Sequence, residues 1–184
     1  MSKDDFTEHQ LDSTQVYDGR LLKVYKDNVR LPDDSRATRE YIKHPGAVAI
    51  LAVLPDGKVL LERQYRYPHH RDFIEIPAGK IDPGEDILNT AKRELLEETG
   101  YTATEWRHLT TIHPLIAYSD EVIELFLAQG LTPGERSLDP GEFLEVMHVD
   151  RKEALNWVLE GKIDDAKSMV GLMWLDKLER GDWS

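Results

Sequence analysis

Apolar residues alternate with polar ones, or run together in short stretches, along most of this chain, and the pattern predicts strands. The run from Ala47 to Leu54 is uninterrupted, which is typical of a strand that is buried on both faces. Pro55-Asp56-Gly57 has the composition of a hairpin turn, and residues 59–67 form the next predicted strand. Further strands are predicted over 106–112, 122–127 and 144–149.

A similar pattern near the N-terminus predicts a β-hairpin. Residues 21–31 alternate well enough for a strand, Pro32-Asp33-Asp34-Ser35 is a turn cluster, and residues 36–42 form the returning strand. Residues 1–14 are polar, and we expect them to be poorly ordered.

Three segments carry apolar residues at helical spacing. The first follows the turn Asp82-Pro83-Gly84 and stops at Gly100. The other two begin at Asp150 and at Asp164 or Asp165, whose side chains can cap a helix. One central helix and two C-terminal helices among many short strands predict an α+β fold, with helices packed on a mixed sheet.

The chain has 184 residues, which is enough for one domain with a substantial core. We expect residues 44–184 to form this domain and residues 1–43 to form an N-terminal hairpin extension. The amphipathic face of the hairpin must pack somewhere, and a second copy of the chain would supply a surface, so we expect a homodimer.

The composition limits the cellular compartment and the kinds of partner that we expect. The chain has no cysteine, which excludes disulfides and thiolate metal sites. The polar N-terminus and the lack of a long apolar run lead us to expect a cytoplasmic protein without a membrane partner. The net charge of −12 argues against nucleic acid, which requires clustered lysine and arginine. A small diphosphate can still bind where cations and local arginines reverse the field.

The predicted central helix carries an unusual group of acidic residues. Glu94, Glu97 and Glu98 stand at positions i, i+3 and i+4, so a regular helix would place them on one face, where like charges repel. A hard divalent cation would reverse that penalty, because Mg²⁺ takes carboxylate and phosphate oxygens together. The alternative is a solvated acidic face. The glycine turn before the helix, Arg93 within it and the glycine after it favour the metal site.

The stretch from Gly79 to Tyr101 resembles the Nudix box, which reads Gly, five residues, Glu, seven residues, then Arg-Glu-apolar-any-Glu-Glu-any-Gly-apolar. Every position is matched, by Gly79, Glu85, Arg93, Glu94, Leu95, Glu97, Glu98, Gly100 and Tyr101. The resemblance covers about residues 40–180 and implies the Nudix fold, an α/β/α sandwich. The N-terminal hairpin resembles that of the ADP-ribose pyrophosphatase branch of the superfamily.

The resemblance implies a metal-dependent hydrolase and assigns roles within the box. Glu94 and Glu98 are the expected primary ligands of Mg²⁺, with Mn²⁺ as the alternative metal. Glu97 would bind a further ion or order its shell, and the carbonyl of Ala78 would add a backbone oxygen. Arg93 would pair with a box glutamate and orient it.

The general base is expected outside the box. Members of this branch often supply a catalytic glutamate from a late loop, and Glu142 follows the turn Asp139-Pro140-Gly141 in such a place. Glu97 and Glu98 compete for the role, and an ordinary solvated loop acid is the other interpretation of Glu142.

Five further residues resemble substrate-binding positions of the same branch: Arg39, Arg66, Glu75, Ser119 and Glu121. Arg66 could pair with a diphosphate in bidentate fashion. For Glu75, a strand glutamate that faces solvent is the alternative. The tripeptide Ser119-Asp120-Glu121 fits the branch, but Ile116-Ala117 stands where the branch commonly has Pro-Gly.

The expected reaction is hydrolysis of ADP-ribose to AMP and ribose 5-phosphate. The departure at Ile116-Ala117 leaves open a broader nucleoside-diphosphate-sugar hydrolase, or one that prefers a GDP- or UDP-sugar. An alternative of another class is a sensor that binds a nucleotide sugar without cleaving it. The complete set of glutamates favours the enzyme, because a pure binder does not need every metal carboxylate.

Overall fold

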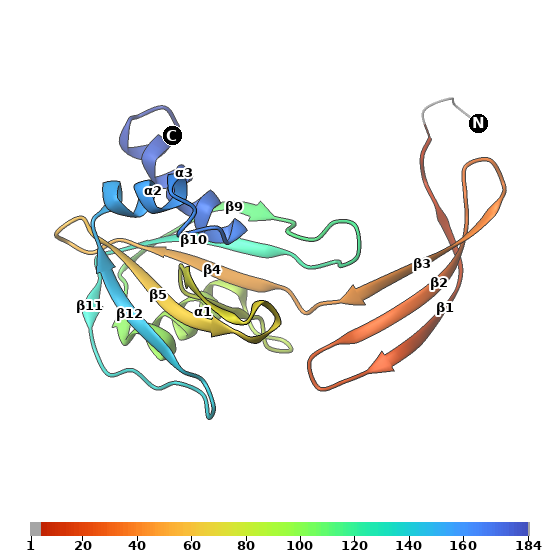
Figure 1. Cartoon of the computed structure of the whole chain (residues 1–184), viewed down its shortest axis with the longest axis horizontal. Coiled ribbons are helices and arrows are strands. Elements are labelled where there is room, and N and C mark those ends of the chain that lie inside the picture. The colour runs from red at the N-terminus through yellow and green to blue at the C-terminus, as the bar shows by residue number, and fades with distance from the viewer. Residues whose placement is uncertain (1–4, 184) are drawn as a thin grey trace. The chain divides into compact units, whose positions relative to one another are not determined.

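The computed structural model describes residues 5–183 of the chain (Figure 1). The chain forms two compact units. The first unit comprises the residues up to Pro45 together with Leu115–Val122, and the second comprises Gly46–Pro114 and the residues from Ile123 onward. The division expected from the sequence, 1–43 and 44–184, stays a prediction, and residues 1–4 and 184 of those ranges lie outside the described residues.

The first unit contains an antiparallel sheet of three strands in the order β1-β2-β3, which are β1 (His9–Asp18), β2 (Lys23–Arg30) and β3 (Arg36–Lys43). The predicted hairpin is β2 and β3. The expectation that residues 1–14 are poorly ordered was wrong from His9 onward. Side-chain hydrogen bonds join β1 to β2: Gln10 Nε2 donates to Asp27 Oδ2 at 2.8 Å, and Asn28 Nδ2 donates to Asp12 Oδ1 at 2.9 Å.

The second unit contains a mixed sheet and an antiparallel sheet. In the mixed sheet, of order β7-β4-β10-β9, β4 runs parallel to β10 and the other neighbours are antiparallel. Its strands are β4 (Ala47–Ala52), β7 (Ala78–Lys80), β9 (Glu105–Ile112) and β10 (Ile123–Gln129). The second sheet, of order β12-β5-β6, consists of β5 (Val59–Arg66), β6 (Arg71–Glu75) and β12 (Leu144–Val149). Two short strands, β8 (Tyr101–Thr102) and β11 (Thr132–Pro133), pair with each other.

The helices of the second unit begin where aspartate side chains accept hydrogen bonds from the first backbone N–H groups. Asp86, Asp150 and Asp165 are these caps. The helices are α1 (Ile87–Glu94), α2 (Arg151–Leu159) and α3 (Ala166–Glu179), together with the π-helical turn η2 (Leu95–Thr99) and the 3-10 turn η1 (Tyr67–His69).

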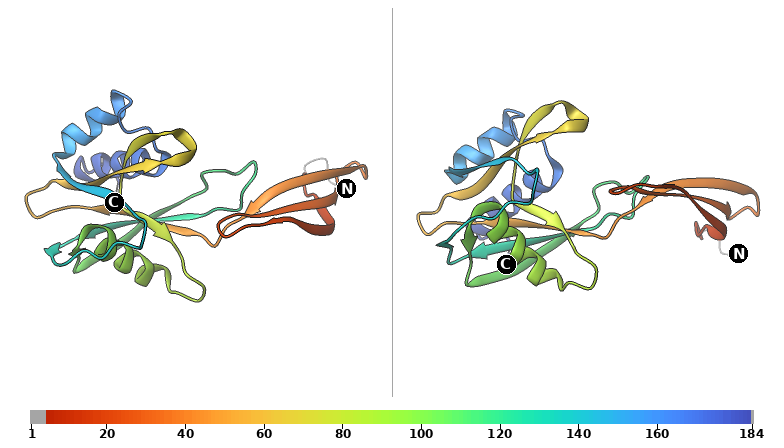
Figure 2. Two further views of the ribbon diagram at one scale, coloured as in Figure 1. Left: turned by 60° about the horizontal axis from the view of Figure 1, so that its bottom comes forward. Right: turned by 90° about the horizontal axis from the view of Figure 1, so that it is seen from below.

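Strand β4 shows how the layers of the second unit are built. Its side chains point alternately to the two faces of the sheet, and every residue of the strand is buried. Leu51 and the residues that alternate with it along β4 pack in one cluster with Leu172 of α3. Ile50 and the residues on its face of the strand pack with Ala91 of α1 and Leu95 of η2, which together form the helix of the Nudix box, called the box helix below. Helices therefore cover opposite faces of the sheets, as Figure 2 shows, and the predicted α/β/α sandwich is confirmed.

No helix within residues 5–183 is long and apolar enough to span a membrane.

Candidate active site

The site begins where strand β7 passes the box helix. Gly79 lies in β7, and a Cβ atom built on it would come within 3.0 Å of the carboxylate carbon of Glu94, closer than real Cβ atoms approach. The preceding residue of the strand also contacts the helix, because the backbone N–H of Ala78 donates a hydrogen bond to Oε2 of Glu98 at 3.0 Å. The absence of a side chain at residue 79 therefore allows the helix carboxylates to lie against the strand.

The box helix is not regular, and this corrects the expected arrangement of its glutamates. The α-helical part ends at Glu94, and Leu95–Thr99 form a π turn that ends at Gly100, whose φ is +76°. A π turn holds more residues than an α turn, so the side chains after Glu94 are rotated from the i, i+3, i+4 pattern. Glu98 is only 5% exposed, whereas the side chain of Glu97 is 37% exposed. The expected apolar face changes too, since Ile87 and Leu96 are exposed.

Arg93 joins three glutamates of the box. Its guanidinium donates to Glu85 at 2.9 and 2.8 Å, to Glu94 at 2.8 Å and to Glu97 at 3.0 Å. The hydrogen bond from Arg93 is the largest cause that lowers the pKa of Glu85, to about 2. One arginine therefore fixes the positions of several carboxylates but neutralises only one negative charge.

Glu98 is a buried acid and Glu94 a partly buried one, and the charged forms of both are disfavoured. The pKa of Glu98 is raised, chiefly by burial and then by the negative charges of Glu62, Glu94 and Glu142. Burial likewise raises the pKa of Glu94, against the attraction of Arg93. These shifts show that the carboxylates act on each other through a poorly solvated region.

Glu62, on β5, is a member of this cluster that the sequence reasoning missed. Its side chain is buried, and its pKa is raised by burial and then by the charges of Glu142 and Glu75. A signal for it was present, because the strand alternation that makes Leu60 apolar and buried places an acid at residue 62.

Glu142, the expected base, lies in the loop before β12. Its Oε1 atom accepts a hydrogen bond of 3.4 Å from Gln64 Nε2, and its charge acts on Glu62, Glu94 and Glu98. Glu145, three residues later, is instead exposed and bonded to Arg63 at 2.6 and 2.9 Å. The structure thus brings Glu142, and not Glu145, to the carboxylate cluster.

Glu75 does not face solvent, which corrects one of the two sequence interpretations. It is buried at the end of β6 and binds the guanidinium of Arg66 through both oxygens, at 2.6 and 2.7 Å. Lys167 of α3 also contacts it. Burial acts to raise the pKa of Glu75, but Arg66 and Lys167 outweigh it and the pKa is lowered. The ion pair with Lys167 joins residues 92 positions apart in the sequence, so the sequence alone gave no sign of it.

The NUDIX domain family matches residues 43–170, and the family of nucleoside diphosphate sugar hydrolase N-terminal domains matches residues 8–42. The chain belongs to the Nudix family. An ADP-ribose pyrophosphatase of Bacillus subtilis is 41% identical over 90% of each chain. A methanol dehydrogenase activator of Bacillus methanolicus is 37% identical over 95% of each chain. A crystal structure of an ADP compounds hydrolase shares the fold, with a TM-score of 0.86, 22% identity and 98% coverage of both chains.

Nudix hydrolases generally need a divalent metal, and the side chains of this site have the chemical groups that bind such an ion. The donors are carboxylate oxygens, which magnesium and manganese prefer. Buried carboxylates repel one another, and one buried oxygen, Oε1 of Glu62, has no hydrogen-bond partner in the described chain. No three acidic or histidine side chains among residues 5–183 already converge as a metal site.

Three expected substrate residues of this Nudix chain lie in the first unit. Arg39 Nε donates to Glu8 Oε2 at 2.8 Å, and both side chains are partly exposed. Ser119 Oγ donates to the carbonyl of Ile42 at 3.3 Å. Glu121 lies 3.9 Å from Nε2 of His44. The box, Arg66 and Glu75 belong to the second unit, so the roles of Arg39, Ser119 and Glu121 stay predictions.

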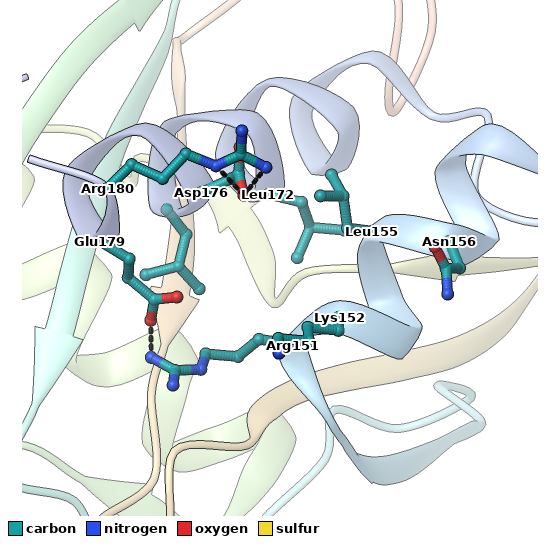
Figure 3. A pocket seen from close by; sticks show the side chains of 9 residues that line it. Arg151, Lys152, Leu155, Asn156, Leu172, Asp176, Glu179 and Arg180 are labelled. Atoms are coloured by element: carbon teal, nitrogen blue, oxygen red, sulfur yellow. Dashed lines mark hydrogen bonds and ion pairs between the residues drawn. The ribbon is translucent and has the colours of Figure 1, made fainter. Parts of the chain in front are cut away.

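A separate pocket of about 440 Å³ lies between α2 and α3 (Figure 3). Two of its basic side chains are already paired, Arg151 with Glu179 and Arg180 with Asp176. No residue of the Nudix box lines this pocket. We therefore place the candidate active site at the glutamates and not here.

Proposed function

We propose that this Nudix hydrolase cleaves the diphosphate bond of ADP-ribose and releases AMP and ribose 5-phosphate. The observation that carries the proposal is the buried carboxylate cluster around Glu98, held against β7 by the Ala78 N–H and the space left by Gly79. The substrate follows from the 41% identity with an ADP-ribose pyrophosphatase over nine-tenths of both chains.

We propose a separate role for each group of this site. Glu94 and Glu98 would hold Mg²⁺, with Mn²⁺ as the alternative, and the chemistry supplied by such an ion is neutralisation of phosphoryl charge and a lower pKa for bound water. Arg93 keeps the box carboxylates in place through its hydrogen bonds to Glu85, Glu94 and Glu97. The carbonyl of Ala78 would add a backbone oxygen, and Glu97 would hold a further ion or its shell.

Glu142 is the proposed general base. It would take the proton from a water whose oxygen attacks one phosphorus, while the bond from that phosphorus to the bridging oxygen breaks. The bridging oxygen then leaves with the other phosphate. Glu142 is half-buried in a loop and its charge reaches the cluster, which supports this role over the exposed and paired Glu145.

Arg66 is the proposed contact to the diphosphate. Its Nε and one terminal nitrogen are bound to Glu75, while its side chain remains 42% exposed. Glu75, which Lys167 also binds, therefore fixes the guanidinium of Arg66, and the remaining N–H groups of Arg66 are free to bind a phosphate oxygen. Arg39, Ser119 and Glu121 would complete substrate binding.

A GDP- or UDP-sugar is the alternative substrate, because Ile116-Ala117 departs from the pattern of the ADP-ribose branch. A sensor without activity is disfavoured, since it would bury repelling carboxylates without using them. The deciding experiment is a panel of nucleoside diphosphate sugars incubated with Mg²⁺ and full-length protein, with identification of the products. AMP and ribose 5-phosphate are expected from ADP-ribose. Faster turnover of a GDP- or UDP-sugar, or binding without turnover, would contradict the proposal.

We also propose a cytoplasmic homodimer that pairs through the first unit. Strand β1 is an edge strand, and apolar side chains on it and in the following turn are exposed: Leu11, Val16, Tyr17, Leu21 and Leu22. Exposed apolar groups on an edge strand are a surface on which a second copy can pack.

A further inference from the structure

Glu62 is a buried acid that the proposed mechanism does not yet use. It is 3% exposed, and its Oε1 atom is one of two buried side-chain atoms in residues 5–183 that lack a hydrogen-bond partner. The other, Oδ1 of Asp27, belongs to a carboxylate that accepts from Gln10 through its second oxygen. The side chain of Glu62 makes neither a hydrogen bond nor an ion pair with any described residue.

The strand register makes the position of Glu62 unfavourable in the absence of a cation. Glu62 lies directly opposite Glu75 on β6, so the two acids share one face of the sheet. The nearby cations are already engaged, because Arg66 and Lys167 both bind Glu75. A buried carboxylate without a partner is strongly destabilising. The free energy of folding alone therefore gives no reason for an acid at this position.

Glu98 is a second buried carboxylate with a free oxygen, and its charge interacts with that of Glu62. Glu98 uses Oε2 to accept from the Ala78 N–H, and its Oε1 has no hydrogen-bond partner among the described residues. The charges of Glu62 and Glu98 act on each other, and Glu142 acts on both. Two buried acids from different elements, each with an uncommitted oxygen, form an arrangement that a cation would complete.

We propose that Glu62 binds a divalent cation together with Glu98, as a strand carboxylate added to the glutamates of the Nudix box. The inference rests on the proposed function only in that it uses the same carboxylate cluster. The residue opposite Glu62 on β12 is Val146, an apolar side chain, so the cation would be reached from the side of Glu98 and Glu142.

The test is titration of the full-length, metal-free protein with Mn²⁺, followed by calorimetry and by the electron paramagnetic resonance of free Mn²⁺. Glu62→Gln keeps the shape of the side chain and removes its charge. We expect its affinity for at least one Mn²⁺ to fall by roughly tenfold or more. Its melting temperature without metal should be at least that of the wild type, because a buried repulsion is removed, and the rise on adding Mn²⁺ should shrink.

Glu145→Gln is the matched control, since Glu145 is an exposed acid on the neighbouring strand β12 and is paired with Arg63. It should bind Mn²⁺ like the wild type. Glu62→Met is a second variant, with an apolar side chain of similar length. Wild-type Mn²⁺ affinity and stoichiometry in Glu62→Gln or Glu62→Met would overturn the inference. Failure of both variants to fold would assign Glu62 a structural role and would overturn it as well.

The same experiment separates this inference from the proposed function. A wild-type protein that binds Mn²⁺ through Glu62 but releases no AMP from ADP-ribose would sink the proposed function and leave the inference standing. Release of AMP by a wild type whose Mn²⁺ affinity does not depend on Glu62 would sink the inference alone.

Discussion

Gly79 lies so close to the side chain of Glu94 that there is no room for a Cβ atom at residue 79. A Cβ at residue 79 would overlap the carboxylate of Glu94, which Arg93 holds in this position through a hydrogen bond of 2.8 Å. The glycine of the box is therefore required by packing against a functional side chain and not by its own backbone angle.

The first prediction is that Gly79→Ala displaces Glu94 and lowers kcat by about 100-fold, since small displacements of reacting groups have effects of this size. Overpacking should also lower the free energy of unfolding by about 1–3 kcal/mol. Steady-state kinetics and urea unfolding measure both effects. Gly161→Ala is the control: its φ of +72° makes alanine strained, but its Cβ would meet no atom within 4 Å. It should lose stability and keep kcat, and an equal loss of kcat in both variants would argue against the packing explanation.

The second prediction concerns pH. The pKa of Glu98 is raised in the folded state, chiefly by burial, above the ordinary carboxyl value of about 4.3. Between that value and the raised one, the folded protein binds more protons than the unfolded chain, so the stability of the metal-free protein should fall as pH rises. Glu98→Gln should reduce this slope, to which the raised pKa values of Glu62 and Glu94 also contribute, and metal-free Glu98→Gln should be more stable than the wild type at pH 8 but not at pH 4. Chemical unfolding across this pH range measures the effect. A metal-free wild type that becomes more stable from pH 5 to pH 8, with the same slope in Glu98→Gln, would contradict it.

The third prediction tests the base. Glu142→Gln should lower kcat for ADP-ribose by roughly 100- to 10,000-fold, the usual contribution of general base catalysis. Its melting temperature should change little, because its one side-chain hydrogen bond, to Gln64, is long. Glu145→Gln, on the same segment, should keep wild-type kcat. An unchanged kcat in Glu142→Gln would remove Glu142 as the base and leave Glu97 or Glu98.

The fourth prediction tests how Arg66 is held. Arg66→Lys keeps the charge but loses the two-point hydrogen bond to Glu75, so the cation would no longer be aimed at the diphosphate. We expect KM for ADP-ribose to rise about tenfold, which corresponds to the loss of roughly one charge-assisted hydrogen bond. Arg63→Lys changes the same residue type three positions earlier in the strand, where the partners Asp72 and Glu145 are exposed. Its KM should stay at the wild-type value, and equal KM values in the two variants would be evidence against a diphosphate contact.

The fifth prediction tests the dimer. Val16→Asp places a charge among the exposed apolar residues of β1 and the following turn, so it should halve the mass measured by light scattering. Leu159→Asp makes the same kind of change at an exposed apolar position on α2, in the second unit, and should leave the mass unchanged. A monomeric wild type, or a dimer that only Leu159→Asp disrupts, would rule out pairing through the first unit.

Where burial or a local hydrogen bond decided the structure, the sequence was a sufficient guide. The apolar run at β4 became a strand covered on both faces, and Asp150 and Asp165 cap the helices that they were expected to cap. The pattern at residues 16–18 indicates a strand that leads into a turn, but the earlier part of β1, residues 9–15, escaped detection because its residues are exposed and polar contacts such as Gln10 with Asp27 join it to β2. Hydrophobic alternation cannot reveal a strand that buries nothing.

The site was predictable where a motif marks it and not where distant segments meet. The Nudix box pattern identified Glu94, Glu98 and Arg93, but the π turn that buries Glu98 and leaves Glu97 partly exposed has no signature in the spacing of glutamates. Glu62 was missed because a single acid in a strand usually faces solvent. The contact of Lys167 with Glu75 depends on how α3 packs on the sheet, which local sequence patterns do not encode.

The contact between Lys167 and Glu75 connects the last helix, α3, to the proposed substrate contact at Arg66. Lys167 binds the carboxylate of Glu75, which in turn binds Arg66, so a displacement of α3 would reach the proposed diphosphate contact through the side chains of Lys167, Glu75 and Arg66. A ligand or partner that binds α3 would therefore be expected to change the affinity for substrate. A shortened protein that ends before α3 would retain every residue of the box and still be a poor enzyme.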